Sequence, residues 1–345
     1  MAVSDQDEVD LVPVVRVIQA ARDSGVKVLL VAKALSPAGL HQLMRTGADD
    51  FAPYPLPEDA LIDAISRLRS AFSEQPKAEA AKARKRHGII MPVYGVAGGV
   101  GATTFAVNLA WELALLSKKT DKRVCLLDFN FQFGSVSTYL DLPRREAIYE
   151  LISDPTDMDH DALSQALTSY KTRLAVLTAP MDALPLDIIA PEDIAKLLAI
   201  TQASYDFVVV DMPHTLVHWS DNVLRMAETF FAVLEIDMRS AQNCLRFLRA
   251  LKAEDLPYEK VQFALNRAPG ALDLNGKARA KRLAESLNVE INILLPDGGK
   301  GVQSSGDEGL PLAETQAKNA LRKEIRSIAQ SIFEAVIAEK AAVVQ

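Results

Sequence analysis

The stretch VYGVAGGVGATTFAVNLAWELALL, from Val93 to Leu116, decides the fold. It joins one apolar run to an apolar helical segment through a glycine-rich loop, the setting in which backbone N–H groups and a helix N-terminus hold phosphate. A loop of the form G-x-x-x-x-G-K-[ST] has a lysine after its last glycine, whereas Ala102 stands there in this chain. The sequence therefore predicts a phosphate-binding loop that lacks its lysine.

The glycines and a threonine of this loop fit phosphate binding. Gly98, Gly99 and Gly101 allow the backbone to approach a phosphate closely, and a helix that begins near Ala102 offers free N–H groups. The hydroxyl of Thr103 stands where it would ligate Mg²⁺. The alternative is a tight strand-to-helix turn without a ligand, so the choice depends on partner motifs elsewhere in the chain.

Carboxylates end two further apolar runs, as those partner motifs require. RVCLLDFNFQFG brings Asp128 to the end of one predicted strand. YDFVVVDMP brings Asp211 to the end of another, like a Walker B carboxylate that holds Mg²⁺ through water. Together with the glycine loop, these strand ends favour a nucleotide site over a structural turn.

Near-continuous apolar runs alternate with helical segments from the glycine loop onward. Such runs are typical of strands that are buried on both faces of a sheet, and the alternation predicts a doubly wound parallel α/β sheet. The predicted strands are GIIMPVYGV, RVCLLDF, RLAVLTA, DFVVVDM, TFFAVLEI, VQFALNR and INILLP.

Composition limits the classes of function. The chain has 345 residues, is 49% hydrophobic and carries a net charge of -7, which disfavours strong nucleic-acid binding. Its two cysteines, Cys125 and Cys244, lie in apolar or helical segments and offer neither a disulfide framework nor a thiolate metal site. No apolar run approaches the ~18 residues of a membrane-spanning helix. We therefore expect a cytoplasmic protein.

The sequence divides into three parts: residues 1–72, a linker at 73–87 and a domain at 88–345. SEQPKAEAAKARKRH lacks an apolar stripe and is typical of a solvated linker, although KARKRH also suits contact with nucleic acid or an anionic membrane. Upstream, the pattern predicts a helix at 14–25, a strand at 26–32 and helices at 40–47 and 57–72. The alternation indicates a small α/β unit.

GADDFAPYPLPEDAL, at 47–61, resembles the closing segment of a two-component receiver domain. Tyr54 stands where that family carries its active-site lysine, and the strands with the phospho-acceptor aspartate are expected to lie before Met1. The resemblance thus implies a partial receiver-like unit that docks or dimerises and cannot run the phosphorelay. The alternative is an unrelated helical extension.

The order AGGVGATT, LLDFNFQFG, VVVDMP, ALNR and LLPDGG resembles the deviant-Walker ATPases of the MinD and ParA superfamily. GGVGATT followed by D-x-x-x-Q-F-G and YLDLP is similar to the CpaE/TadZ branch, whose members also carry a receiver-like N-terminal domain. The similarity covers residues 88–340 well and residues 20–72 more weakly. It implies ATP and Mg²⁺ as cofactors.

The resemblance also assigns roles to individual positions. Asn130 replaces the aspartate that helps to position the attacking water, and Ala97 and Ala102 replace the two lysines. Asn266, Arg267, Pro296 and Asp297 would frame the adenine, while Thr103, Asp128 and Asp211 would hold or flank the metal. The implied phosphate cradle comprises Gly98, Gly99, Val100, Gly101, Ala102, Thr103 and Thr104.

Two functions follow from the resemblance. The first is an ATP-binding scaffold that localises assembly of a Tad-type pilus or related secretion apparatus, with the secretion ATPase among its partners and a cell pole or the inner membrane face as its site. The second is a cycling ParA- or MinD-type ATPase that positions cargo on membrane or DNA. Loss of both lysines favours the first, with weak or no hydrolysis and a homodimer formed across the nucleotide sites.

Two further segments carry weaker signals. His214 and His218 stand four apart in PHTLVHW, which suits a metal, but no acidic partner accompanies them and a switch-like loop is the preferred interpretation. The segment LRKEIRSIAQSIFEAVIAEK predicts an amphipathic helix. Its mixed charges favour packing against the sheet over membrane contact, which would be peripheral at most.

Overall fold

A computed structural model describes residues 2–4, 11–23, 26, 28–33, 35–36, 39, 43, 46–55, 87–153 and 158–343. The chain forms two compact units, Met1–Arg84 and Lys85–Gln345. The predicted helix at 57–72 and all of the linker except His87 lie outside the described residues, as does most of the predicted helix at 40–47.

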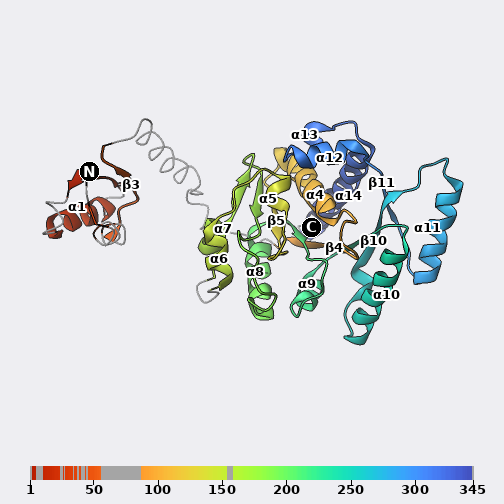
Figure 1. Ribbon diagram of the computed structural model, residues 1–345. Coiled ribbons are helices and arrows are strands. Elements are labelled where there is room, and N and C mark those ends of the chain that lie inside the picture. The colour runs from red at the N-terminus through yellow and green to blue at the C-terminus, as the bar shows by residue number, and fades with distance from the viewer. Residues whose placement is uncertain are drawn as a thin grey trace. The chain divides into compact units, whose positions relative to one another are not determined.

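An eight-stranded sheet forms the centre of the larger unit (Figure 1). Its strand order is β11-β10-β9-β4-β8-β5-β7-β6. The strands are β4 (Ile89–Gly95), β5 (Val124–Asp128), β6 (Thr168–Tyr170), β7 (Leu174–Leu177), β8 (Phe207–Asp211), β9 (Phe230–Leu234), β10 (Val261–Ala268) and β11 (Ile293–Pro296). All seven predicted strands are present, and the α/β fold is confirmed.

The edge strand corrects one detail of the predicted sheet. β6 pairs antiparallel with β7, with Thr168 opposite Val176, whereas every other pair in this sheet is parallel. β6 has only three residues and returns through a turn at Lys171 and Thr172, both with positive φ. A run this short, with one apolar residue, gives no hydrophobic periodicity to detect.

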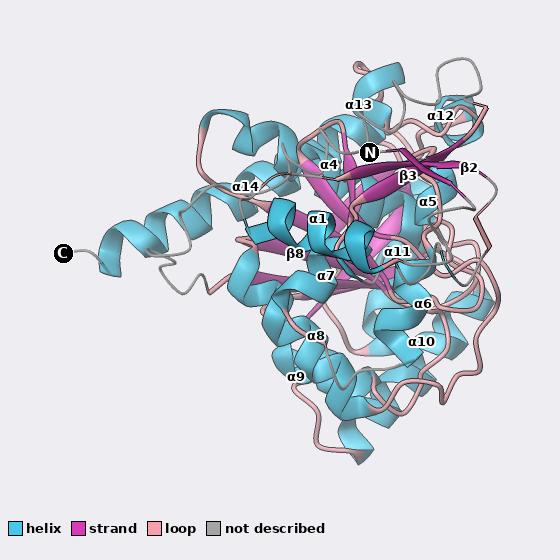
Figure 2. Cartoon of the chain, turned by 90° about the vertical axis from the view of Figure 1, so that its left-hand side faces the viewer, coloured by secondary structure: helices cyan, strands magenta, loops and turns pink. Residues whose placement is uncertain are grey.

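Helices cover both faces of the sheet, which therefore has two hydrophobic layers (Figures 1 and 2). One face carries α4 (Ala102–Leu116), α5 (Val136–Tyr139), α12 (Lys300–Asp307), α13 (Leu312–Thr315) and α14 (Ala320–Val343). The other carries α6 (Glu146–Ser153), α7 (His160–Ala166), α8 (Pro191–Ser204), α9 (Ser220–Met226), α10 (Met238–Ala253) and α11 (Leu274–Leu287). Short 3-10 turns lie at Ser117–Lys119 and Tyr258–Lys260.

Helix α4 lies in the middle of its layer and has no solvent-facing side. All ten residues from Phe105 to Ala114 are buried. Glu112 is among them, and its carboxylate accepts hydrogen bonds from Nε and Nη2 of Arg322 on α14, at 2.6 and 3.3 Å. This ion pair and the apolar contacts of Leu321, Ile325 and Ala329 fix α14 against α4, as predicted for a helix that packs on the sheet.

Membrane-spanning helices are not found in the described part of the chain. None of its helices is both long enough and apolar enough to cross a bilayer.

The smaller unit contains a three-stranded parallel sheet in the order β1-β2-β3. Its elements are β1 (Ala2–Ser4), α1 (Val12–Asp23), β2 (Leu29–Lys33) and β3 (Asp50–Pro53). Val3, Ile18, Leu30 and Leu43 meet in its core. The predicted helix at 14–25 and strand at 26–32 correspond to α1 and β2, while β1 and β3 were not predicted as strands.

Candidate functional site

The glycine loop connects β4 to α4 in a conformation that its glycines permit. Gly99 and Gly101 have φ angles of 81° and 90°, a region that residues with a Cβ rarely adopt. A Cβ on Gly101 would also lie 2.5 Å from Nδ2 of Asn266. In contrast, a Cβ on Gly98 or Gly99 would meet no atom within 4 Å, so this part of the loop faces open space.

The backbone N–H groups of the loop are free to bind an anion. Within the described residues, none of the seven N–H groups from Gly98 to Thr104 donates to a protein acceptor. The last three belong to the first turn of α4, where the helix dipole also favours negative charge. Gly101, the residue before the helix, caps it without a side chain. A phosphate group fits this set of donors.

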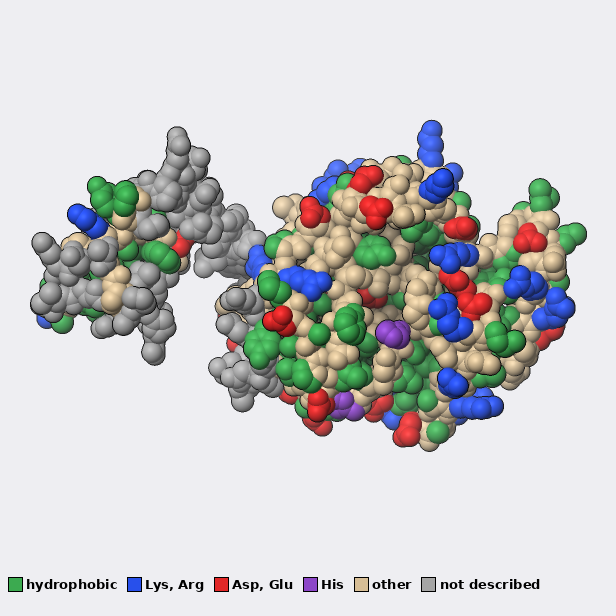
Figure 3. Space-filling model, viewed as in Figure 1, with side chains coloured by type: hydrophobic (Ala, Val, Ile, Leu, Met, Phe, Trp, Pro, Cys, Tyr) green, Lys and Arg blue, Asp and Glu red, His purple; other side chains and the backbone are tan. Residues whose placement is uncertain are grey.

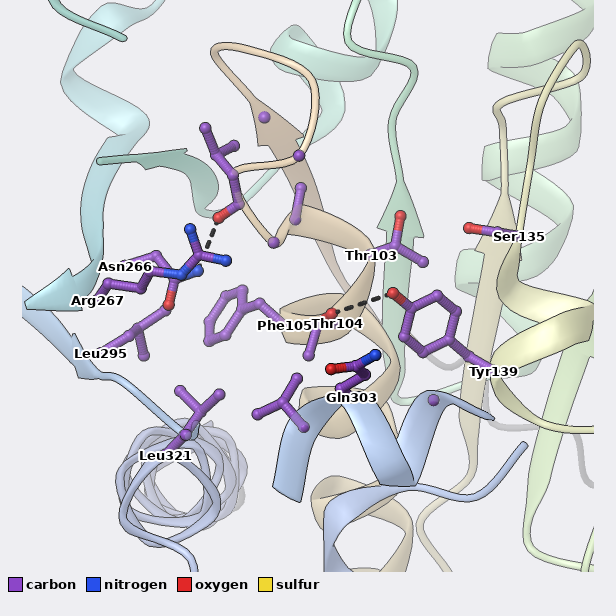
Figure 4. Close-up of a pocket in the computed structure, with 18 of the residues that line it drawn as sticks. Thr103, Thr104, Phe105, Ser135, Tyr139, Asn266, Arg267, Leu295, Gln303 and Leu321 are labelled. Atoms are coloured by element: carbon purple, nitrogen blue, oxygen red, sulfur yellow. Dashed lines mark hydrogen bonds between the residues drawn. The ribbon is translucent and has the colours of Figure 1, made fainter. Parts of the chain in front are cut away.

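A pocket of about 840 Å³ opens in front of the loop (Figure 4). The volume suits a drug-sized or nucleotide-sized ligand, for which pockets of ~300–1,000 Å³ are usual. Of the residues implicated by sequence, its lining includes Gly98, Gly99, Val100, Gly101, Ala102, Thr103, Thr104, Asn130, Asn266, Arg267 and Asp297. Asp128, Pro296 and Asp211 are not among the lining residues.

Thr103 and Asp211 form the part of the site that suits Mg²⁺. The Thr103 hydroxyl donates to Oδ2 of Asp211 at 2.8 Å. Oδ1 of Asp211 is buried and has no hydrogen-bond partner within the described residues. A carboxylate oxygen left without a partner is costly, and a hydrated cation beside Thr103 would provide one. The residues present therefore fit a magnesium ion held by the hydroxyl and, through water, by the carboxylate.

Asp128 is fully buried and both of its carboxylate oxygens bind backbone groups. Oδ1 accepts from N–H of Asn130 and Oδ2 from N–H of Val136, both at 3.1 Å. These bonds close the turn after β5, and a Cβ on Gly134 would lie 2.4 Å from the same carboxylate. Asp128 thus shapes the loop that carries Asn130, and the geometry favours Asp211 over Asp128 as the carboxylate available to a metal.

Burial raises the pKa of both aspartates above the ordinary value. For Asp211 the loss of hydration is the main cause, the charge of Asp128 adds to it, and the hydrogen bond from Thr103 opposes it. For Asp128 burial again dominates, opposed by the backbone N–H groups and the charge of Arg144. The two residues are register partners on adjacent strands. The two carboxyl groups thus resist ionising together, and a bound cation would favour their charged forms.

Asn266 and Arg267, at the end of β10, line the opposite side of the pocket (Figure 4). Asn266 uses its amide to hold the glycine loop, because Nδ2 donates to the carbonyl of Val100 at 2.8 Å. Arg267 Nη1 lies 3.0 Å from Oε1 of Glu235. Apolar side chains complete this side of the pocket, namely Phe105, Leu295, Val302, Leu321 and Ile325.

Several lining residues were missed by sequence reasoning. Tyr139 accepts a long hydrogen bond from the Thr104 hydroxyl at 3.4 Å, and Ser135 and Gln303 also face the pocket (Figure 4). Tyr139 belongs to the YLDLP segment, which was used only as a mark of resemblance. Their types and spacing match no ligand-binding motif, so only the fold brings them to the loop.

The three positions at which the resemblance leads us to expect lysine or aspartate differ in their surroundings. Ala97 is 5% exposed and packs in the core beside α4, and it also lines the pocket. Ala102 is half-buried in the pocket wall. Asn130 lines the pocket, and its side-chain oxygen accepts from N–H of Phe133 at 3.2 Å.

His214 and His218 have different surroundings, so they do not form a pair. His214 lines the pocket, whereas Nε2 of His218 lies 3.1 Å from the carbonyl of Ile189. No group of three or more potential metal ligands of the His, Cys, Asp and Glu types occurs in the described part of the chain. The positions of the two histidines agree with the interpretation of this segment as a loop beside the pocket.

The sequence and the structure of this chain are similar to those of known proteins. Residues 89–256 match a family model described as an AAA domain. The chromosome-partitioning ATPase Soj of Treponema pallidum (strain Nichols) is 26% identical over 252 residues, which cover 68% of this chain and 93% of Soj. A ParA family ATPase from Chlorobium tepidum TLS has a TM-score of 0.63 at 20% identity, covering 70% of this chain and 98% of that structure. The fold is that of the MinD and ParA ATPases.

A MinD structure also places a nucleotide on this fold. The septum site-determining protein MinD complexed with Mg-ADP from Pyrococcus horikoshii OT3 has a TM-score of 0.57 at 18% identity, covering 71% of this chain and 95% of that structure. Both structural comparisons show the same fold, and the MinD structure carries its nucleotide as Mg-ADP.

Asp211→Asn is expected to stabilise the protein in the absence of ligand, by about 1–3 kcal/mol, because it removes a buried charge and its repulsion of Asp128. The folded-state pKa of Asp211 is raised, so the wild type loses stability as pH rises above the ordinary aspartate pKa. The stability advantage of the variant should therefore widen with pH. Thermal unfolding at several pH values measures it.

Asp128→Asn provides the contrasting control. Both Asp128 oxygens accept backbone N–H groups, and an amide would place its own NH₂ against one of them. We expect this variant to unfold at a lower temperature than the wild type. Equal effects of the two substitutions would contradict the different roles assigned to the carboxylates.

Proposed function

We propose that the chain binds ATP with Mg²⁺ at the glycine loop and uses the bound state to localise a protein assembly. The observation that carries this proposal is the row of seven acceptor-free N–H groups from Gly98 to Thr104, which faces a pocket of nucleotide size. Bound Mg²⁺ would neutralise phosphate charge. Thr103 and Asp211 would hold the ion, and Asn266 keeps the loop in shape through Val100.

The adenine would lie against the apolar side of the pocket. Leu295 and Leu321 provide apolar contact there, and Arg267 and Asp297 supply polar groups. Asp297 Oδ1 already accepts from N–H of Gly299 at 2.9 Å, which fixes the turn after β11. Pro296, immediately before it, would restrict the backbone of the same turn.

The finer assignment is a scaffold of the CpaE/TadZ kind, for a Tad-type pilus or related secretion apparatus. Alanine at positions 97 and 102 and asparagine at 130 support a protein that binds nucleotide without rapid turnover. Residues 1–72 would recruit a partner such as the secretion ATPase, joined by a linker at 73–87 to the nucleotide-binding domain at 88–345. A homodimer across the nucleotide sites completes this proposal.

The second candidate is a cycling ATPase that positions cargo on membrane or DNA. The similarity to Soj over 68% of this chain favours it, because that relative is named as a chromosome-partitioning ATPase. The two candidates share the nucleotide site and differ in whether ATP is turned over. Hydrolysis therefore separates them.

ATP binding is expected to be measurable and weak. The loop N–H groups and the metal remain, but each lost charge-assisted hydrogen bond removes ~1.5–3 kcal/mol, which predicts about micromolar affinity or poorer. Calorimetry with ATP, with and without Mg²⁺, is the measurement. Thr103→Ala should weaken Mg-ATP binding and leave metal-free ATP binding nearly unchanged. An absence of heat at millimolar ATP would contradict the proposed function.

ATP hydrolysis by the chain alone is expected to stay near background. A cation at the transferred phosphoryl group contributes ~10³–10⁵ in rate, and the positions of both lysines are alanine here. Steady-state phosphate release by the wild type and Asp211→Ala, measured side by side, tests this. Appreciable turnover by the wild type alone, lost in Asp211→Ala, would favour the cycling ATPase.

A further inference from the structure

The side chains that line the pocket offer little positive charge to a triphosphate. Arg267 is the one lysine or arginine among the lining residues. Its guanidinium lies 3.0 Å from the carboxylate of Glu235. Asp297 and Asp307 line the same pocket and are acidic. A polyanion held there by N–H groups alone would meet a negatively charged wall.

Arg239, at the start of α10, brings a positive charge to the loop from outside the pocket. Its Nη1 donates to the carbonyl of Gly98 at 3.1 Å. Among the described residues, it is the one lysine or arginine whose side chain bonds to the loop between Gly95 and Phe105. Gly98 immediately follows Ala97, so the guanidinium lies at the end of the loop where one lysine is replaced.

The local contacts leave the Arg239 charge available. Nη2 lies 3.4 Å from Oδ2 of Asp237, and the two side chains are 57% and 37% exposed, so this ion pair is weak. Asp237 also caps α10, because its Oδ1 accepts a hydrogen bond from N–H of Ser240 at 2.6 Å. The cap holds the first turn of α10 beside the loop and leaves several guanidinium N–H groups free for an anion.

We propose that Arg239 supplies from α10 the positive charge that Ala97 and Ala102 do not, and that it makes the glycine loop prefer a nucleoside triphosphate over a diphosphate. Its hydrogen bond to the Gly98 carbonyl polarises the peptide whose N–H belongs to Gly99, which strengthens that donor toward phosphate. Its charge acts more strongly on a ligand with one more phosphoryl group. The inference rests on the proposed nucleotide site.

Arg246 provides a matched control on the same helix. It is an exposed arginine about two turns further along α10 and has no bond to the loop. Figure 3 shows Lys and Arg side chains over the part of the surface that α10 and α11 form. Removal of a charge there changes the electrostatic potential of this surface but leaves the contact with Gly98 in place. Arg239→Gln and Arg246→Gln alter net charge equally.

The experiment measures dissociation constants of the full chain for Mg-ATP and Mg-ADP at low and moderate salt. We expect Arg239→Gln to weaken ATP binding about tenfold and ADP binding less, with a smaller salt dependence. Arg246→Gln should bind as the wild type does. Arg239→Lys, which keeps the charge, should recover most of the ATP preference, which a purely structural role for Arg239 would not predict.

The outcomes separate this inference from the proposed function. Wild-type binding of ATP with equal affinities for Arg239→Gln and Arg246→Gln would overturn the role of Arg239 and leave the nucleotide site standing. Failure of Arg239→Lys to recover the preference would also overturn it. No ATP binding by the wild type would overturn both.

Discussion

Gly101→Ala is expected to abolish nucleotide binding, with a loss of at least about 100-fold in affinity. The new Cβ would lie 2.5 Å from Nδ2 of Asn266, and the backbone at φ 90° disfavours any residue with a side chain. Either the loop or the Asn266 side chain would have to move, and both shifts disturb the hydrogen bond from Asn266 to the Val100 carbonyl that holds the loop. Calorimetry with Mg-ATP measures the affinity, and thermal unfolding shows whether the variant still folds.

Gly270→Ala is the matched control for this change. A Cβ on Gly270 would meet no atom within 4 Å, and its φ is not positive. The double variant Gly101→Ala with Asn266→Ala removes the clash and keeps the backbone strain, so it should recover stability only in part. Unchanged ATP affinity in folded Gly101→Ala would show that the loop binds nothing in this conformation.

Arg322→Met is expected to destabilise the protein by about 3–5 kcal/mol, because it leaves Glu112 buried without its partner. Glu112 is 2% exposed, and burial already raises its pKa although Arg322 opposes the shift. Without the arginine the folded-state pKa would rise further, so the loss of stability should be smallest at acidic pH and grow as pH increases. Urea unfolding at two pH values measures it.

The double variant Glu112→Leu with Arg322→Met tests the cause. Replacing both members of a buried ion pair by apolar residues is often close to neutral, so most of the stability should return. A double variant as unstable as Arg322→Met would instead indicate that the arginine acts through packing or through its bond to the Ala317 carbonyl.

The strands and the glycine loop were predictable because their signals are local. Apolar runs such as FVVVD, at Phe207–Asp211, can be recognised as strands without tertiary information. The loop glycines indicate by themselves a backbone conformation that other residues rarely adopt. β6 was not predictable, since its three residues pair only because β7 presents a free edge. The position of α14 was predictable from its apolar stripe, but its ion pair with Glu112 was not.

The site residues divide in the same way. Thr103 and Asp211 follow from their positions at a helix start and a strand end. Asn266 was named only through the resemblance, which assigned it to the adenine, and Arg239 was not named at all. Each donates a hydrogen bond to a loop carbonyl more than 100 residues away along the chain. Contacts of this kind leave no periodicity or spacing in a single sequence, and only the fold reveals them.

The complete burial of α4 restricts which changes the chain can accept directly after its glycine loop. Inserting or deleting one residue in α4 would turn the rest of the helix by about 100° and misalign every buried side chain from Phe105 to Ala114. A one-residue change of length within α4 is therefore excluded, and the helix that follows the glycines can change only by substitution in place. The first turn of α10 differs, because Met238 and Arg239 are exposed there and can be substituted without disturbing the core.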